Sequence, residues 1–150
     1  MNNIEALLNE FGPCVYGYIV SKLGKCDDAD DVYQTVFLRL LEKRPVFADK
    51  RAVRSWLLKT AYNCTMDIFR ARQKTCPLTD DMVANDNANN IFDIISHLDK
   101  DYRDVTYLFY QENMKIKEIA KVLSLNEGTV KTRLRRARSQ LLEFYKEEIL

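Results

Sequence analysis

The sequence predicts an all-α protein made of two small helical domains. Its 150 residues contain only 4 Gly and 3 Pro, so sharp turns are few. Apolar residues recur at helical spacing through most of the chain, and 47% of all residues are hydrophobic, which is enough to form a packed core. Near the C-terminus, a short helix, a three-residue turn and a second helix are expected in succession.

The net charge is close to zero, but its distribution along the chain is uneven. The chain holds 23 Lys and Arg against 22 Asp and Glu, a net charge of +1, which by itself argues against a nucleic-acid partner. Residues 75–104 hold two basic and seven acidic groups, whereas residues 131–138 hold five basic groups and no acidic one. The total is therefore an average over segments of opposite sign.

The composition also argues against several classes of protein. The four cysteines (Cys14, Cys26, Cys64 and Cys76) form no C-x-x-C pair, and His97 is the single histidine. We therefore expect no metal site, no cofactor and no enzyme activity, and free thiols in a reducing cytoplasm. The acidic, amphipathic N-terminus does not resemble a secretory signal, and no apolar run approaches the 18 residues of a membrane span, so we expect no membrane insertion.

A polar, acidic segment divides the chain. Residues 75–90 combine Pro with clustered Asn and Asp and show little apolar periodicity, as is typical of a linker. We therefore predict a domain over residues 1–74, an acidic flexible linker over 75–90, and a second domain over 91–150.

The first domain is predicted to hold four helices. Gly12 and Pro13 are expected to separate the first helix from the second, with Pro13 in a first helical turn. The third helix opens with four aspartates, which suit the partial positive charge of a helix N-terminus, although paired carboxylates could instead bind Mg²⁺. The expected ranges are 4–11, 13–24, 27–43 and 51–73.

The helix over 27–43 has an apolar side and a polar side. The residues expected in the core are Ala29, Val32, Tyr33, Val36, Phe37 and Leu40. The polar side carries Asp31, Gln34, Thr35, Leu38 and Glu42. Leu38 is either an ordinary exposed leucine or the apolar centre of a protein interface with a polar rim.

The helix over 51–73 is divided in the same way. Its expected core residues are Val53, Trp56, Leu57, Thr60, Ala61, Cys64 and Ile68. The remaining arc carries Lys59, Tyr62, Asn63, Met66, Phe69 and Arg70. Cations, an amide and aromatic rings on one surface suit unpaired bases, but the same residues also fit a helix that is buried on two sides.

The second domain carries the strongest motif. Its helices are expected near 91–97, 100–112, 115–123 and 127–146, with His97 ending the first of them. The turn over 124–126 has Ser124 where Gly would favour a left-handed backbone, and Asn126 is a good N-cap for the helix that follows. This succession predicts a helix-turn-helix.

The faces of the helix over 127–146 favour DNA binding. Val130, Leu134, Ala137 and Leu141 recur at helical spacing and should pack on the domain. The other residues should contact base edges and phosphates in a major groove. They are Gly128, Thr129, Lys131, Thr132, Arg135, Arg136 and Ser139.

Three motifs in order resemble those of the extracytoplasmic-function (ECF) sigma factors, in the sigma-70 family of bacterial RNA polymerase. DADDVYQTVF at 28–37 is similar to the core-binding helix of that family. VRSWLLKTAYN at 53–63 resembles its Trp-Leu segment, and residues 116–142, with EGTVK at 127–131, match its helix-turn-helix.

The resemblance implies a promoter-specificity subunit with no active site of its own. Contacts to the clamp helices of the largest polymerase subunit are implied for Asp31, Gln34, Thr35 and Leu38, and further contact to the flap of the second-largest subunit. Minus-ten contacts are implied for Lys59, Tyr62, Asn63, Arg70 and Arg72. Minus-thirty-five contacts are implied for the residues of the 127–146 helix given above. An anti-sigma partner is also implied, and it could hold the protein at the membrane.

Two residues depart from the family pattern, and one alternative function stays open. Thr35 stands where the family commonly has Glu, and Val53 stands where it commonly has an aromatic residue. The alternative is a stand-alone helix-turn-helix regulator, which would act as a dimer on palindromic sites. That alternative leaves the polar side of the 27–43 helix and the basic arc of the 51–73 helix unexplained.

Overall fold

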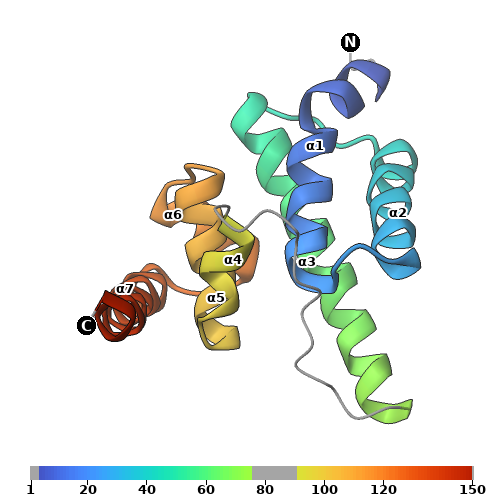
Figure 1. Cartoon of the computed structure of the whole chain (residues 1–150). Coiled ribbons are helices and arrows are strands. Elements are labelled where there is room, and N and C mark those ends of the chain that lie inside the picture. The colour runs from blue at the N-terminus through green and yellow to red at the C-terminus, as the bar shows by residue number, and fades with distance from the viewer. Residues whose placement is uncertain (1–3, 76–90, 150) are drawn as a thin grey trace. The chain divides into compact units, whose positions relative to one another are not determined.

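The chain folds into two compact helical units, Met1–Val83 and Ala84–Leu150 (Figure 1). The computed structural model describes residues 4–75 and 91–149, and within these ranges every regular element is a helix. The division between the units falls inside the predicted linker, of which residues 76–90 lie outside the described ranges. No helix in the described ranges is both long enough and apolar enough to cross a membrane.

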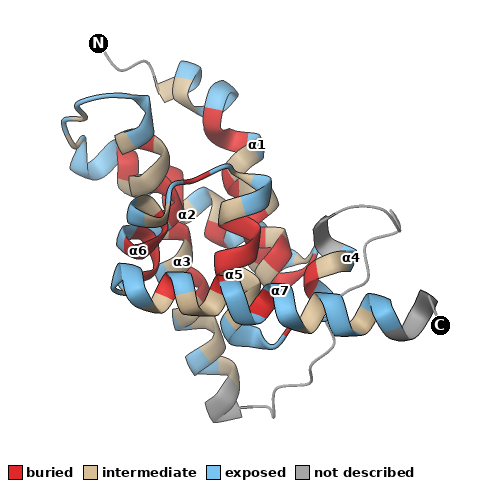
Figure 2. Ribbon diagram, turned by 90° about the vertical axis from the view of Figure 1, so that its left-hand side faces the viewer, coloured by how far each residue is buried: buried red, intermediate tan, exposed pale blue. Residues whose placement is uncertain are grey.

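Three helices that pack pairwise against one another form the first unit. They are α1 (Ile4–Leu23), α2 (Asp27–Lys43) and α3 (Lys50–Thr75). Each helix turns one apolar side to a shared core, whose buried residues are drawn in red in Figure 2. The most completely buried side chains include Val15, Tyr18, Ile19, Val36, Leu40, Leu57 and Leu58.

The predicted break at Gly12-Pro13 is wrong, because α1 runs through both residues as one helix. A proline inside a helix removes one backbone hydrogen bond and costs about 3 kcal/mol. Residues on both sides of Pro13, including Phe11 and Val15, are buried in the same core. Gly12 allows close packing on α2, since a Cβ at that position would lie 2.6 Å from Tyr33 Oη. Tertiary packing therefore outweighs the local preference for a helix break at Gly12 and Pro13.

Two short connections set where α2 ends and where α3 begins. Arg44 adopts a left-handed conformation (φ 41°) and its N–H donates to the Leu40 carbonyl oxygen, which ends α2. The Asp49 carboxylate accepts the N–H of Ala52 at 2.9 Å and caps α3. These boundaries agree with the predicted ranges to within one or two residues.

The second unit is built around α7. Its elements are α4 (Ile91–Ser96), α5 (Lys100–Thr106), a π-helical segment η1 (Tyr107–Gln111), α6 (Ile116–Leu123) and α7 (Glu127–Ile149). Both α5 and α6 pack on α7. The buried residues at this core include Ile95, Leu98, Val105, Leu108, Ile119, Val122, Val130 and Leu134.

The predicted single helix over 100–112 is interrupted by the π-helical register of η1. The N–H of Glu112 donates to the Tyr107 carbonyl oxygen at 3.3 Å, five residues back. Tyr107 is buried in this register, whereas Tyr110 is exposed and its hydroxyl accepts a hydrogen bond from Arg138 Nε at 2.7 Å. Because Arg138 lies 28 residues further along the chain, local periodicity carries no sign of this contact.

The helix-turn-helix forms as the sequence predicts. Ser124 is left-handed (φ 56°, ψ 43°) and its N–H donates to the Ala120 carbonyl oxygen, which ends α6. The N–H of Leu125 donates to the same oxygen at 2.9 Å. Asn126 caps α7, since its side-chain oxygen accepts the N–H of Thr129 at 2.7 Å. Both predictions, the tight turn and the Asn cap, are confirmed.

We expect Ser124→Gly to raise the free energy of unfolding by about 0.5–1 kcal/mol. A left-handed backbone costs an L-residue about 1–2 kcal/mol, part of which the larger unfolded-state entropy of glycine offsets. Urea unfolding of the full chain measures the change. Ser124→Ala is the matched control, since it keeps the strained conformation and should bring no gain. Equal stability of the Gly and Ala variants would contradict the argument.

Candidate nucleic-acid and protein interfaces

The predicted polar side of α2 lies at the surface and surrounds an exposed leucine. Asp31 and Gln34 are exposed, and Leu38 is 55% exposed. The Thr35 hydroxyl donates to the Asp31 carbonyl oxygen at 2.8 Å, so it is engaged within the helix. The sequence prediction missed Leu41, which is 42% exposed and lies three residues further along the same helix. Two exposed leucines beside polar residues fit a protein interface better than an isolated surface leucine does.

The aspartates at the start of α2 are bonded to other helices. Arg72 Nη2 of α3 lies 2.6 Å from Asp28 Oδ2, and the Tyr16 hydroxyl of α1 donates to Asp30 at 3.0 Å. The hydrogen bond to Asp30 raises the pKa of the Tyr16 phenol. Within the described ranges, no three His, Cys, Asp or Glu side chains gather in a way that could hold a metal ion. Asp28 and Asp30 thus connect the start of α2 to α3 and α1.

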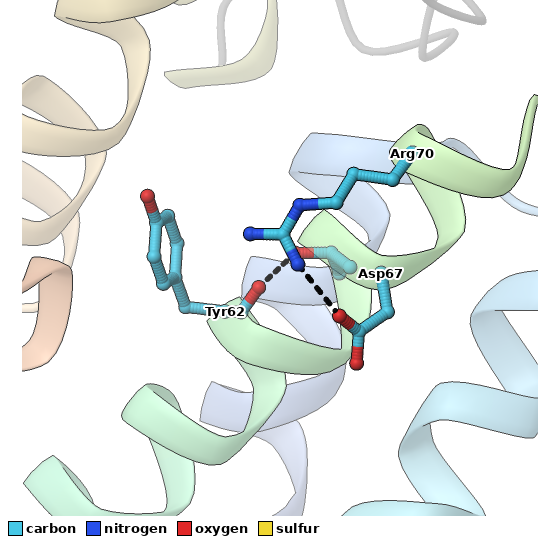
Figure 3. Close-up of polar contacts among 4 residues, drawn as sticks. Tyr62, Asp67 and Arg70 are labelled. Carbon is cyan, nitrogen blue, oxygen red and sulfur yellow. Dashed lines mark hydrogen bonds and ion pairs between the residues drawn. The ribbon is translucent and has the colours of Figure 1, made fainter. Parts of the chain in front are cut away.

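One arc of α3 presents polar side chains to solvent. Lys59, Asn63 and Arg70 are exposed and Tyr62 is half-buried. The Arg70 side chain folds back along the helix, where Nη1 lies 3.0 Å from Asp67 Oδ1 (Figure 3). From Lys59 to Arg70 the arc extends about 16 Å along the helix. An amide can hydrogen-bond the edge of an unpaired base, and a tyrosine ring and arginine guanidinium can stack on its face.

The aromatic and thiol groups of α3 are less open than the polar ones. Phe69 is half-buried, and Lys22 Nζ of α1 lies 5.7 Å from its ring centroid. Cys64 is buried beside Asn63, and burial raises the pKa of its thiol, which makes it a poor nucleophile at neutral pH. Cys14, Cys26 and Cys64 take part in no disulfide bond among the described residues, and Cys76 lies outside those residues.

Arg72 differs from the other residues predicted to contact a DNA strand. It is half-buried and directed at Asp28, whereas the side chain of Arg70 is 73% exposed. The structure therefore places four of the five predicted residues on a solvent-facing arc of α3 and turns the fifth toward α2.

The helix α7 is buried on one side only. Val130, Leu134 and Ala137 have at most 1% exposure, as predicted, and Leu141 is half-buried. The opposite side exposes Gly128, Lys131, Arg135, Arg136 and Ser139, with Thr129 and Thr132 half-buried. Among the described residues, no carboxylate forms an ion pair with Lys131, Arg135 or Arg136. Their charges are therefore available to a phosphate backbone.

A pocket of about 510 Å³ extends from the start of α7 to α5. Four of the predicted contact residues line it, namely Gly128, Thr129, Thr132 and Arg136. Sequence reasoning missed the other four lining residues, which are Asp101, Tyr102, Asn126 and Arg133. Helical spacing alone could have indicated Arg133, one turn from Thr129 and Arg136, but only the packing of α5 on α7 brings Asp101 and Tyr102 to this surface.

Family models match both units of the chain. Residues 7–75 match the model of sigma-70 region 2, and residues 88–141 match that of sigma-70 region 4. The RNA polymerase sigma-E factor of Streptomyces avermitilis is 31% identical over 125 residues, covering 77% of this chain and 70% of that protein. The ECF RNA polymerase sigma factor SigW of Bacillus subtilis is 29% identical over 150 residues, covering 85% and 80% of the two chains.

Two solved structures share the fold. The sigma factor RpoE of Bartonella quintana, in complex with the anti-sigma factor NepR, superposes with a TM-score of 0.75 at 20% identity, covering 95% of this chain and 96% of that one. CnrH, in complex with the cytosolic domain of CnrY, gives a TM-score of 0.71 at 24% identity, and the match covers 96% of this chain and 88% of that one.

A two-domain helical protein with a basic helix-turn-helix and an exposed polar arc in its other domain belongs to the promoter-binding class. More particularly, the chain belongs to the ECF sigma factors of the sigma-70 family. It is a promoter-recognition subunit of RNA polymerase, and members of this family are non-catalytic regulatory subunits. The stand-alone regulator is not favoured, because both units match sigma-factor models.

Proposed function

We propose that this chain reads the minus-thirty-five promoter element with α7 and the minus-ten element with α3, while α2 holds it on core polymerase. The observation that carries the proposal is the exposed cationic side of α7, whose opposite side is buried. A helix held in this way can enter a major groove, where Arg and Lys read guanine edges and neutralise phosphates. The proposed minus-thirty-five contacts are Gly128, Thr129, Lys131, Thr132, Arg135, Arg136 and Ser139.

The minus-ten contacts are proposed for the solvent-facing arc of α3. Asn63 would hydrogen-bond a non-template base flipped out of the duplex, with Tyr62 beside it, and Lys59 and Arg70 would follow the strand. Extruding a base costs a few kcal/mol, which contacts to the flipped base and the strand offset. Promoter opening by this route needs binding energy and no catalytic group in the chain. Arg72 belongs to the same predicted set, but its guanidinium is bonded to Asp28 of α2.

The polymerase surface is proposed for Asp31, Gln34, Thr35 and Leu38 on α2. The exposed leucine would fill an apolar site on the clamp helices of the largest subunit, and the polar residues around it would form the rim. The second unit would also rest on the flap of the second-largest subunit. A chain that made these contacts would act in the cytoplasm, where core polymerase meets promoter DNA.

An anti-sigma protein is the proposed inhibitory partner. This proposal is supported by RpoE of Bartonella quintana, which shares the fold and was solved with the anti-sigma factor NepR. Such a partner would cover the α2 or α7 surfaces that polymerase and DNA need. It could also hold the complex at a membrane.

Transcription in vitro with bacterial core polymerase tests the function directly. With the chain added, we expect transcripts from a defined set of genomic promoters, and sequencing their start sites defines both promoter elements together. Core polymerase alone is the control. Failure to bind core polymerase, or to direct initiation at any promoter in a genomic library, would overturn the proposal.

We expect Leu38→Asp to weaken binding to core polymerase by about tenfold or more, because a carboxylate would be buried in an apolar contact. Fluorescence titration of labelled chain with core polymerase measures the affinity. Leu8→Asp on α1 is the matched control, since Leu8 is also partly exposed (37%) but lies outside the proposed surface. Circular dichroism checks that both variants fold. Normal affinity of the Leu38→Asp variant would place the polymerase contact elsewhere.

We expect Arg136→Ala to cost roughly 1–3 kcal/mol of promoter binding and to relax the preference at one minus-thirty-five position. The measurement is holoenzyme binding to a panel of single-base promoter variants. Lys146→Ala is the control, because Lys146 is an exposed cation in the last turn of the same helix. An unchanged base preference in the Arg136 variant would refute a base contact.

A further inference from the structure

The last turns of α3 are joined to the first turn of α2 by an ion pair. Arg72 Nη2 and Asp28 Oδ2 are 2.6 Å apart, and the two residues are 44 positions apart in the chain. Their side chains are 37% and 46% exposed, so the contact is partly shielded from water. Asp28 also lies in the first helical turn, where the partial positive charge of the helix end favours a carboxylate. Both surroundings favour the contact between Asp28 and Arg72.

The two arginines near the end of α3 face different directions. Residues two positions apart on an α-helix are separated by about 200°, so Arg70 and Arg72 lie on nearly opposite sides. Arg70 is exposed and bonds only three residues back, to Asp67, among the contacts that the structure gives for its side chain. Arg72 is directed at α2. A single DNA strand that follows the arc of Lys59, Asn63 and Arg70 would run along one side of α3, and Arg72 lies on nearly the opposite side.

The end of α3 is less buried than the middle of the helix. Beyond the buried Cys64 and Thr65, the described residues of this helix are half-buried or exposed. Figure 1 shows this part of α3 extending past the neighbouring end of α1. An interhelical ion pair at this point adds a restraint to a segment whose other side chains, such as Phe69, are at most half-buried.

We propose that Arg72 is a positioning residue whose bond to Asp28 holds the DNA-facing arc of α3 in a fixed orientation to the polymerase-facing side of α2. The inference rests on the proposed function, because it assigns α3 to the minus-ten strand and α2 to core polymerase. In this proposal Arg72 acts by bonding Asp28, and it makes no direct contact with DNA. It also gives Asp28 a part in promoter opening, although Asp28 touches no DNA.

The test is a double-mutant cycle in the holoenzyme on a promoter with a fluorescent base in the minus-ten element. We expect Arg72→Gln and Asp28→Asn each to slow strand opening at saturating holoenzyme by about three- to tenfold, with core affinity unchanged. The double variant should be no slower than either single variant, because both remove one interaction. The charge exchange, Asp28→Arg with Arg72→Asp, should open faster than either single variant but slower than the wild type, because it restores the pair and also places a cation at a helix N-terminus.

The salt dependence of promoter binding separates positioning from DNA contact. The logarithm of the binding constant falls linearly with the logarithm of the salt concentration, and loss of one phosphate contact lowers the magnitude of that slope by about one. We expect this decrease for the control Arg70→Ala. Arg72→Gln should leave the slope unchanged. The proposal is overturned if Arg72→Gln lowers the slope while Asp28→Asn has no effect. It is also overturned if the two substitutions slow opening additively. If the wild-type chain directs no transcription with core polymerase, the proposed function itself fails, which is a distinct result.

Discussion

Burial of one side of α7 is the constraint on which the second unit depends. Val130, Leu134 and Ala137 pack into the core, and their burial contributes several kcal/mol in total. Rotation of the helix about its axis would expose these residues, so the basic side is held outward with little freedom. The Ser124 turn and the Asn126 cap fix where the helix begins. Packing and capping therefore determine which residues can reach a DNA groove.

Burial of apolar sides also orients the helices of the first unit, where the two proposed functional faces share one core. α2 and α3 both turn apolar sides inward, and Val36, Leu40, Leu57 and Ala61 are buried there. Their outward sides then carry different chemistry. One has exposed leucines with a polar rim, and the other has an amide, a tyrosine and cations. A three-helix bundle can thus offer separate surfaces to protein and to nucleic acid.

Features that depend on local sequence were predictable, and features that depend on distant contacts were not. Helical spacing correctly separated buried Val32 and Val36 from exposed Gln34 and Leu38, and the Asn126 cap follows from its position before a helix. Continuity through Pro13 depends on burial against another helix, which no local signal carries. Arg72 meets Asp28 only because α3 folds back along α2, and Tyr102 reaches the pocket beside α7 only through the packing of α5. The binding of DNA or polymerase by the proposed contact residues is a prediction, which the variants of Leu38 and Arg136 test.

The π-helical segment η1 makes the length of the chain at this point as important as its composition. A π-turn accommodates one residue more than an α-turn. Removing one residue between 107 and 111 would let an ordinary α-helical turn replace the π-turn, and the residues on its two sides would keep nearly the same relative orientation, because a π-turn absorbs its extra residue locally. The side chains within the segment would shift, and the hydrogen bond from Arg138 to Tyr110 would be lost. A deletion here should therefore act mainly on the contacts of η1 itself and much less on the helix-turn-helix that follows.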